Sequence, residues 1–148
     1  MNELITSLKT AHANTFVMYF KAHSFHWNVE GKLFSQYHDF FSDLYTDLFG
    51  AVDPLAEELR ALDQYAPKSL GELYMSCTLS ENTSIVGDSI SEMLNSLLTD
   101  NNEVINSLNK VFTLASDMNE QGLADLVAGR LDIHKKHGWM LKASLKGQ

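Results

Sequence analysis

The 148-residue sequence contains one cysteine, two prolines and no long apolar run. The single cysteine, Cys77, excludes an internal disulfide and fits a reducing compartment, so we expect a small thiol that is buried or lies in a loop. No segment approaches the roughly 18 apolar residues of a membrane span. The N-terminus also lacks the basic and apolar regions of a secretory signal. We therefore expect a cytoplasmic protein that does not associate with membranes.

Basic residues are scarce as well, with 11 Lys and Arg against 19 Asp and Glu and a formal net charge of −8. A general nucleic-acid binder normally shows a basic face or tail, so this balance argues against that class. It suits a protein that attracts cations. The apolar content of 45% is enough for one sizeable core, and the length fits one domain over residues 1–148.

Apolar residues recur at steps of three and four in four long segments, which predicts four helices near 4–26, 34–62, 90–115 and 123–145. Short polar turns at 28–31 and 117–121 join them in pairs. Residues 67–83 form a longer connection, with room for a short helix at 69–75 and with Ser80, Asn82 and Thr83 as candidate caps. One long link between two hairpins predicts an all-α, ferritin-like four-helix bundle with one crossover connection.

The sequence offers one set of residues suited to binding a metal. His26 and His38 flank the first turn, so they lie at nearly the same height in an antiparallel hairpin. Asp53 and Glu57, four residues apart, share one face of the second helix. Imidazoles and carboxylates together suit Fe(II), Zn(II) or Mn(II).

The four other histidines are expected to have structural roles. His12 and His23 lie among apolar neighbours, which favours packing or a position around the site rather than ligation. His134 and His137 have a spacing that can chelate a metal on one helical face. Because no carboxylate is evident near them, we expect these two histidines to be packed or solvated.

His38 and Asp53 are separated by 15 residues on one predicted helix, or roughly 22 Å. One ion cannot bind both within one chain, so the two pairs are either unrelated or meet across a symmetry axis. A two-fold axis near Tyr45 and Thr46 would create two equivalent sites in an isologous dimer. Bundles that hold two irons within one subunit use Glu-x-x-His motifs, and this sequence contains none, which disfavours an intrasubunit site.

The segment HSFHWNVEG at 23–31, followed by His38 and by DPLAE at 53–57, resembles the signature of the Dps family, the DNA-protecting mini-ferritins of starved cells. The segments ALDQYAP at 61–67 and HKKHGWML at 134–141 are similar to later segments of that family. The resemblance spans essentially the whole chain.

The resemblance implies a spherical dodecamer, built from two-fold dimers, that stores iron in its cavity. In this family two histidines of one subunit and two acids of its partner bind Fe(II), and the matching residues here are His26, His38, Asp53 and Glu57. These four are thus the expected metal ligands and catalytic residues of a ferroxidase. Hydrogen peroxide is the expected oxidant, dioxygen the alternative, and Zn²⁺ a surrogate metal. Trp27 either absorbs stray oxidising equivalents beside the site or is a core aromatic of the hairpin.

Three positions depart from the family pattern. Pro54 lies inside the second helix, where we expect a kink rather than an end because the apolar spacing keeps its phase. Glu58 stands where relatives often carry arginine, and Ser42 where some relatives carry a carboxylate. These departures leave open a cage that sequesters metal without efficient oxidation.

A nucleoid DNA-binding protein is a further alternative, but the chain ends lack lysine- or arginine-rich tails and direct DNA binding is not expected. By resemblance, Asp117, Glu120 and Asp125 line a three-fold entry pore; the alternative is capping and solvation of a helix end. For Asp43, Asp47 and Glu58 we expect solvated surface positions rather than sites of mineral nucleation.

Overall fold

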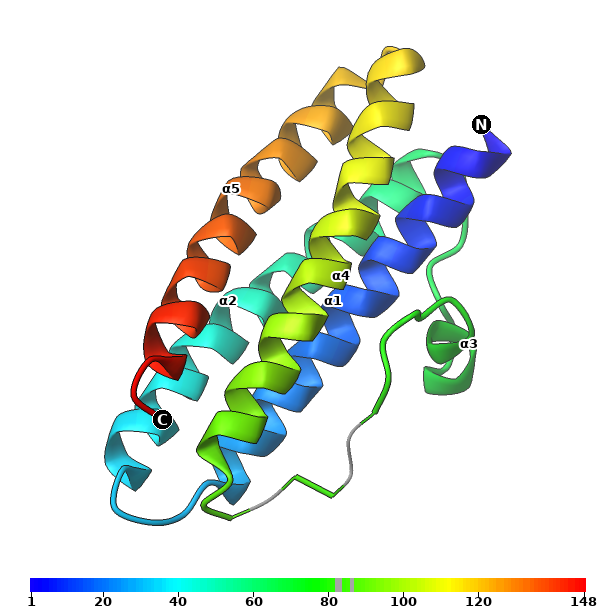
Figure 1. Ribbon diagram of the computed structural model, residues 1–148. Coiled ribbons are helices and arrows are strands. Elements are labelled where there is room, and N and C mark those ends of the chain that lie inside the picture. Colours follow the sequence, from blue (N-terminus) through cyan, green and yellow to red (C-terminus); the bar gives the residue numbers. More distant parts are fainter. Residues whose placement is uncertain (82–83, 86) are drawn as a thin grey trace.

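The computed structural model describes residues 1–81, 84–85 and 87–148. Its helices are α1 (Asn2–Asn28), α2 (Phe34–Ala61), α3 (Leu70–Met75), α4 (Ile90–Asp117) and α5 (Gln121–Leu145). The four long helices lie side by side, and the short α3 lies outside them (Figure 1). In the described part of the chain the only extended pairing is an isolated bridge between Val29 and Gly87. The predicted all-α, ferritin-like four-helix bundle with a crossover connection is confirmed.

Two tight turns make the hairpins. Between α1 and α2, Gly31 has a φ of 106°, a conformation that glycine adopts at little cost. Between α4 and α5, Asn119 has a φ of 60°, which asparagine tolerates better than most residues. Helix α1 packs against α2, α3 and α4, and α5 packs against α4 and α2.

The core is formed by apolar side chains from all four long helices. Fully burying a leucine contributes roughly 2 kcal/mol relative to leaving it in water, so these residues dominate the stability of the bundle. The largest fully buried side chains are Tyr37, Phe41, Leu4, Leu8, Met18, Leu48, Leu55, Leu59, Met93, Leu94, Leu97 and Leu108.

Polar contacts fasten the crossover connection to the bundle. The Nζ of Lys21 in α1 lies 2.7 Å from an Oδ of Asp100 in α4, and both side chains are 6% exposed. The same Nζ donates to the carbonyl oxygen of Ser80 at 2.9 Å. Asn14 donates to the hydroxyl of Thr78 and accepts from its backbone N–H, both at 2.9 Å. A buried ion pair therefore holds α1, α4 and the connection together.

The helix boundaries differ clearly from the prediction at one place. Helix α2 runs through Pro54, as expected, and ends at Ala61, one residue before the expected limit. Helix α4 has Ser89 in the N-cap position, so the prediction that Ser80 caps this helix is wrong; Asn82 and Thr83 lie outside the described residues.

The predicted short helix in the connection is confirmed as α3. Its N-cap is Ser69, whose hydroxyl accepts from the backbone N–H of Glu72 at 3.1 Å. Among the helices of the described segments, none is long and apolar enough to cross a bilayer.

Candidate metal centre

His26 and His38 form a reciprocal pair. The Nδ1 of each ring lies 2.7 Å from the backbone carbonyl oxygen of the other residue. The two rings stack with their centroids 3.7 Å apart and their planes at 17°. Because a carbonyl oxygen only accepts, both Nδ1 atoms carry a proton, so Nε2 is the nitrogen through which either ring could bind a metal. This is the hydrogen-bond pattern that orients histidines for metal binding.

Asp53 and Glu57 form a second pair, farther along α2. Both are exposed and lie on one face of the helix. A hydrogen bond to Asp53, together with the negative charge of Asp53, raises the pKa of the Glu57 carboxyl. The two carboxyl groups are thus close enough to repel each other when ionised. A divalent cation between them would remove that repulsion.

The structure does not bring the two pairs together within one chain. His38 and Asp53 lie on the same uninterrupted helix, which places them roughly 22 Å apart. Searching the described residues finds no group of three or more His, Cys, Asp or Glu side chains that could hold a metal ion. Each pair is therefore at most half of a metal site.

An aromatic cluster lies beside the two histidines. The ring of His23 stacks on Tyr45 with centroids 3.8 Å apart and planes at 9°. The Nδ1 of His23 is 2.9 Å from the Tyr19 hydroxyl, and the ring of Trp27 is 4.1 Å from that of His23. Partial desolvation and the charge of His26 lower the pKa of His23. Trp27 is 57% exposed, so the interpretation of this residue as a core aromatic is wrong.

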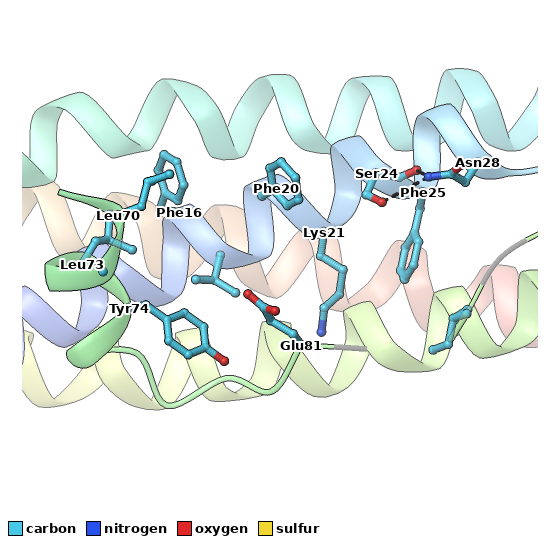
Figure 2. Close-up of a pocket in the computed structure, with 13 residues that line it drawn as sticks. Phe16, Phe20, Lys21, Ser24, Phe25, Asn28, Leu70, Leu73, Tyr74 and Glu81 are labelled. Carbon is cyan, nitrogen blue, oxygen red and sulfur yellow. Dashed lines mark hydrogen bonds between the residues drawn. The ribbon is translucent and has the colours of Figure 1, made fainter. Parts of the chain in front are cut away.

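Large apolar side chains extend this cluster over the outer face of α1 and α2. Phe20 is 53% exposed and Phe49 is 57% exposed. Next to Phe20, a groove of about 590 Å³ runs between α1 and α3, with Phe16 on one side and Leu73 and Tyr74 on the other (Figure 2). Exposed apolar patches of this kind are common at surfaces through which proteins contact other molecules.

A second polar cluster lies in the interior, between α2, α4 and α5, and the sequence analysis did not predict it. Arg130 makes two hydrogen bonds to the carboxylate of Asp47, at 3.1 and 2.9 Å, and a third contact of 2.9 Å to Nε2 of His134. The Nε2 of His137 lies 2.7 Å from Asp47. The expectation that Asp47 is a solvated surface residue is wrong, as is the expectation that His134 and His137 have no carboxylate nearby. The spacing of the two histidines was noted from the sequence, but nothing near them in the sequence points to an acid on a distant helix.

The remaining candidates have simpler surroundings. His12 is buried, and the loss of water around its ring lowers its pKa. Cys77 is a half-buried loop thiol whose pKa burial raises, as expected for an unreactive cysteine. Asp117 and Asp125 are exposed, and Glu120 occupies the N-cap position of α5 without a side-chain capping bond.

Comparisons with known proteins agree with the fold. The family described as a ferritin-like domain matches residues 5–147. A DNA protection during starvation protein from Brevibacillus brevis is 32% identical over 134 residues, which are 90% of this chain and 89% of that protein. General stress protein 20U of Bacillus subtilis is 30% identical over 143 residues, which are 97% of this chain and 97% of that protein.

Solved structures show the same architecture. A crystal structure of a Dps protein from Bacillus brevis superposes with a TM-score of 0.88 at 30% identity, covering 96% of this chain and 94% of that one. A Dps protein from Vibrio cholerae, described as a member of a broad superfamily of ferritin-like diiron-carboxylate proteins, gives a TM-score of 0.91 at 26% identity. It covers 97% of this chain and 89% of that one.

Proposed function

The chain belongs to the Dps proteins of the ferritin-like family, and we propose that it oxidises Fe(II) at sites shared between two subunits. The ferric product is then stored inside a closed oligomer, the dodecamer that the family resemblance implies. Iron storage or protection is the general role that this family membership supports. The finer assignment that we propose is a ferroxidase that uses hydrogen peroxide.

The reciprocal hydrogen bonds of His26 and His38 carry the proposal. They use up both Nδ1 protons and leave the two Nε2 atoms, on stacked rings, as the nitrogens that could bind a metal. A two-fold axis near Tyr45 would bring this pair opposite the Asp53 and Glu57 of the other subunit. The same axis would bury the exposed ring of Phe49 and the aromatic surface around it.

The ligand types suit the reaction. Two carboxylates neutralise and stabilise the ferric state, and two imidazoles leave open coordination positions for an oxidant. Two Fe(II) ions each give up one electron and become Fe(III), and these two electrons with two protons from solvent convert one hydrogen peroxide to two water molecules. No hydroxyl radical is released when both electrons arrive together. Trp27, exposed and stacked near His23, is placed to supply an electron when only one iron is bound.

Stopped-flow absorbance after mixing the protein with Fe(II) and hydrogen peroxide tests the reaction. We expect a fast ferric signal that His38→Ala and Asp53→Ala each abolish. Asp132→Ala, which removes an exposed carboxylate on α5, serves as the matched control and should behave like the parent. Metal binding of normal strength without a fast ferric signal would instead identify a cage that sequesters metal.

Mixing the two inactive variants tests whether the site is shared. In a hybrid dimer, one site combines the intact histidines of one chain with the intact acids of the other, while the second site lacks both. Random pairing makes about half of the dimers hybrids, so roughly a quarter of the parental activity should return. A site within one chain would recover none.

A further inference from the structure

Tyr19, His23 and Tyr45, here named the His23 cluster, lie beside the candidate metal pair without belonging to it. On α1, His23 precedes His26 by three residues and Tyr19 precedes it by seven, about one and two helical turns. Tyr45 follows His38 by seven residues on α2. All three side chains of the cluster are half-buried. The cluster therefore continues the face of His26 and His38 toward the middle of the two helices.

The ring of His23 is held on three sides. Tyr45 stacks on it with the centroids 3.8 Å apart and the planes at 9°, and Trp27 lies 4.1 Å away at 33°. Two rings this close to a third cannot share one of its faces, so Tyr45 and Trp27 cover opposite faces of His23. A hydrogen bond of 2.9 Å joins the Nδ1 of His23 to the hydroxyl of Tyr19 and hinders rotation of the ring within this stack. With both faces and one nitrogen engaged, His23 suits a supporting role better than that of a metal ligand.

The His23 cluster contacts His26 through two rings. The centroid of Tyr45 lies 5.2 Å from that of His26 with the planes at 64°, and the centroid of His23 lies 5.9 Å away at 57°. His38 stacks on His26 at 3.7 Å and accepts the hydrogen bond from its Nδ1 through the backbone oxygen. The ring of His26 therefore has packed rings and a hydrogen bond around it that oppose any change of its side-chain torsions.

We propose that the His23 cluster positions His26, so that the Nε2 of His26 points in one fixed direction before a metal ion arrives. A ring that is already ordered loses less conformational entropy when it binds, which raises the affinity of the site. Residues that orient a metal-binding histidine from outside the ligand shell have this effect. The inference rests on the proposed function, because it gives Tyr19, His23 and Tyr45 a task at the same interface site.

The charge of His23 agrees with this supporting role. Partial desolvation, and then the charge of His26, lower the pKa of His23, so its ring is neutral at pH 7. The cluster therefore orders His26 without adding a positive charge that would repel a divalent cation.

Co²⁺ titration of the assembled full-length chain, followed by visible absorption, tests the proposal without iron oxidation. His23→Ala leaves a gap between Tyr45 and Trp27 and should weaken Co²⁺ binding about 10–100-fold. His23→Phe keeps a flat ring in the stack and loses only the hydrogen bond, so it should weaken binding about fivefold at most. A loss in His23→Phe as large as that in His23→Ala would show that His23 binds the metal itself, and would overturn the proposal.

A double-mutant cycle tests whether Tyr19 acts through His23. Tyr19→Phe removes only the hydroxyl and should weaken Co²⁺ binding as much as His23→Phe does. The variant with both substitutions should bind no more weakly than either single variant, because both changes break the same hydrogen bond. Losses that multiply in the double variant would mean that the two residues act independently, which contradicts the proposal.

Controls separate positioning from general effects on the protein. Phe112→Ala removes a ring that is 38% exposed on α4 and should bind Co²⁺ like the parent. Mass measurement in solution shows whether each variant assembles. If His23→Ala does not assemble, Tyr19→Phe and His23→Phe decide the matter, and unchanged Co²⁺ affinity in both would overturn the proposal.

The same titration separates this inference from the proposed function. A parent protein without a Co²⁺ site that His38→Ala abolishes would contradict the proposed function and this inference with it. A parent that binds Co²⁺ at such a site, with unchanged affinity in the variants of His23 and Tyr19, would contradict this inference alone.

Discussion

The buried ring of His134 should make the protein lose stability on mild acidification. Its pKa is about 3 in the folded chain and 6.5 in the unfolded one, so between these values the unfolded state binds one more proton. Stability is therefore lost as the pH falls through 6.5, and the loss levels off near 3. Between pH 7 and pH 5 the contribution of this one ring falls by about 2 kcal/mol, since each unit of difference corresponds to about 1.4 kcal/mol.

The measurement compares the parent with His134→Gln, which cannot titrate. Urea unfolding is followed by circular dichroism at pH 7 and pH 5, at one protein concentration because assembly contributes to stability. The difference in unfolding free energy between the two proteins should shrink by about 2 kcal/mol at the lower pH. Asp47 does not interfere, because its unfolded pKa of 3.8 lies below this range. An equal loss of unfolding free energy in both proteins between pH 7 and pH 5 would mean that the buried ring of His134 is not held neutral.

Two further predictions concern the rest of the chain. Asp100→Asn leaves the ammonium of Lys21 buried without a counter-charge and should lower the free energy of unfolding in urea by roughly 3–5 kcal/mol. The double variant Lys21→Met, Asp100→Leu removes both charges and should lose much less stability. Equal losses in the two variants would refute this prediction. Phe49→Lys places like charges on the proposed two-fold face and should yield smaller species by mass measurement with unchanged helical content. An intact oligomer would show that this face lies outside the interface.

Much of the fold could be predicted from the sequence because the long helices carry apolar residues at regular spacing. Phe34 and Ile90, with which two of the predicted apolar patterns begin, are also the first residues of α2 and α4. The connection was less predictable, since several polar residues offered caps and only packing selects among them. Ser80 illustrates this: its carbonyl accepts from Lys21 and its side chain caps no helix.

The candidate site was likewise predictable only in part. Because a short turn joins α1 and α2, His26 and His38 were expected to lie at the same level along the hairpin, and the stacking of their rings confirms this. The acid that contacts His137 and Arg130 could not be inferred, because Asp47 is far away in the sequence and local charge patterns do not show which acid turns inward. Spacing predicts contacts within a helix or across a short turn, whereas contacts between distant helices depend on how the bundle packs.

The interior cluster around Asp47 and the surface pairs on α1 and α2 both contain histidines and carboxylates. They differ in what balances the negative charge of the carboxylates. In the interior, Arg130 neutralises Asp47 within the chain, so a metal ion has no net charge to gain there. At the surface, the carboxyl of Asp53 raises the pKa of Glu57, and the Nδ1 atoms of His26 and His38 are taken up by backbone oxygens. The proposed function assigns the compensating cation to iron bound where two subunits meet. If that proposal holds, the two subunits have to assemble before iron can be oxidised.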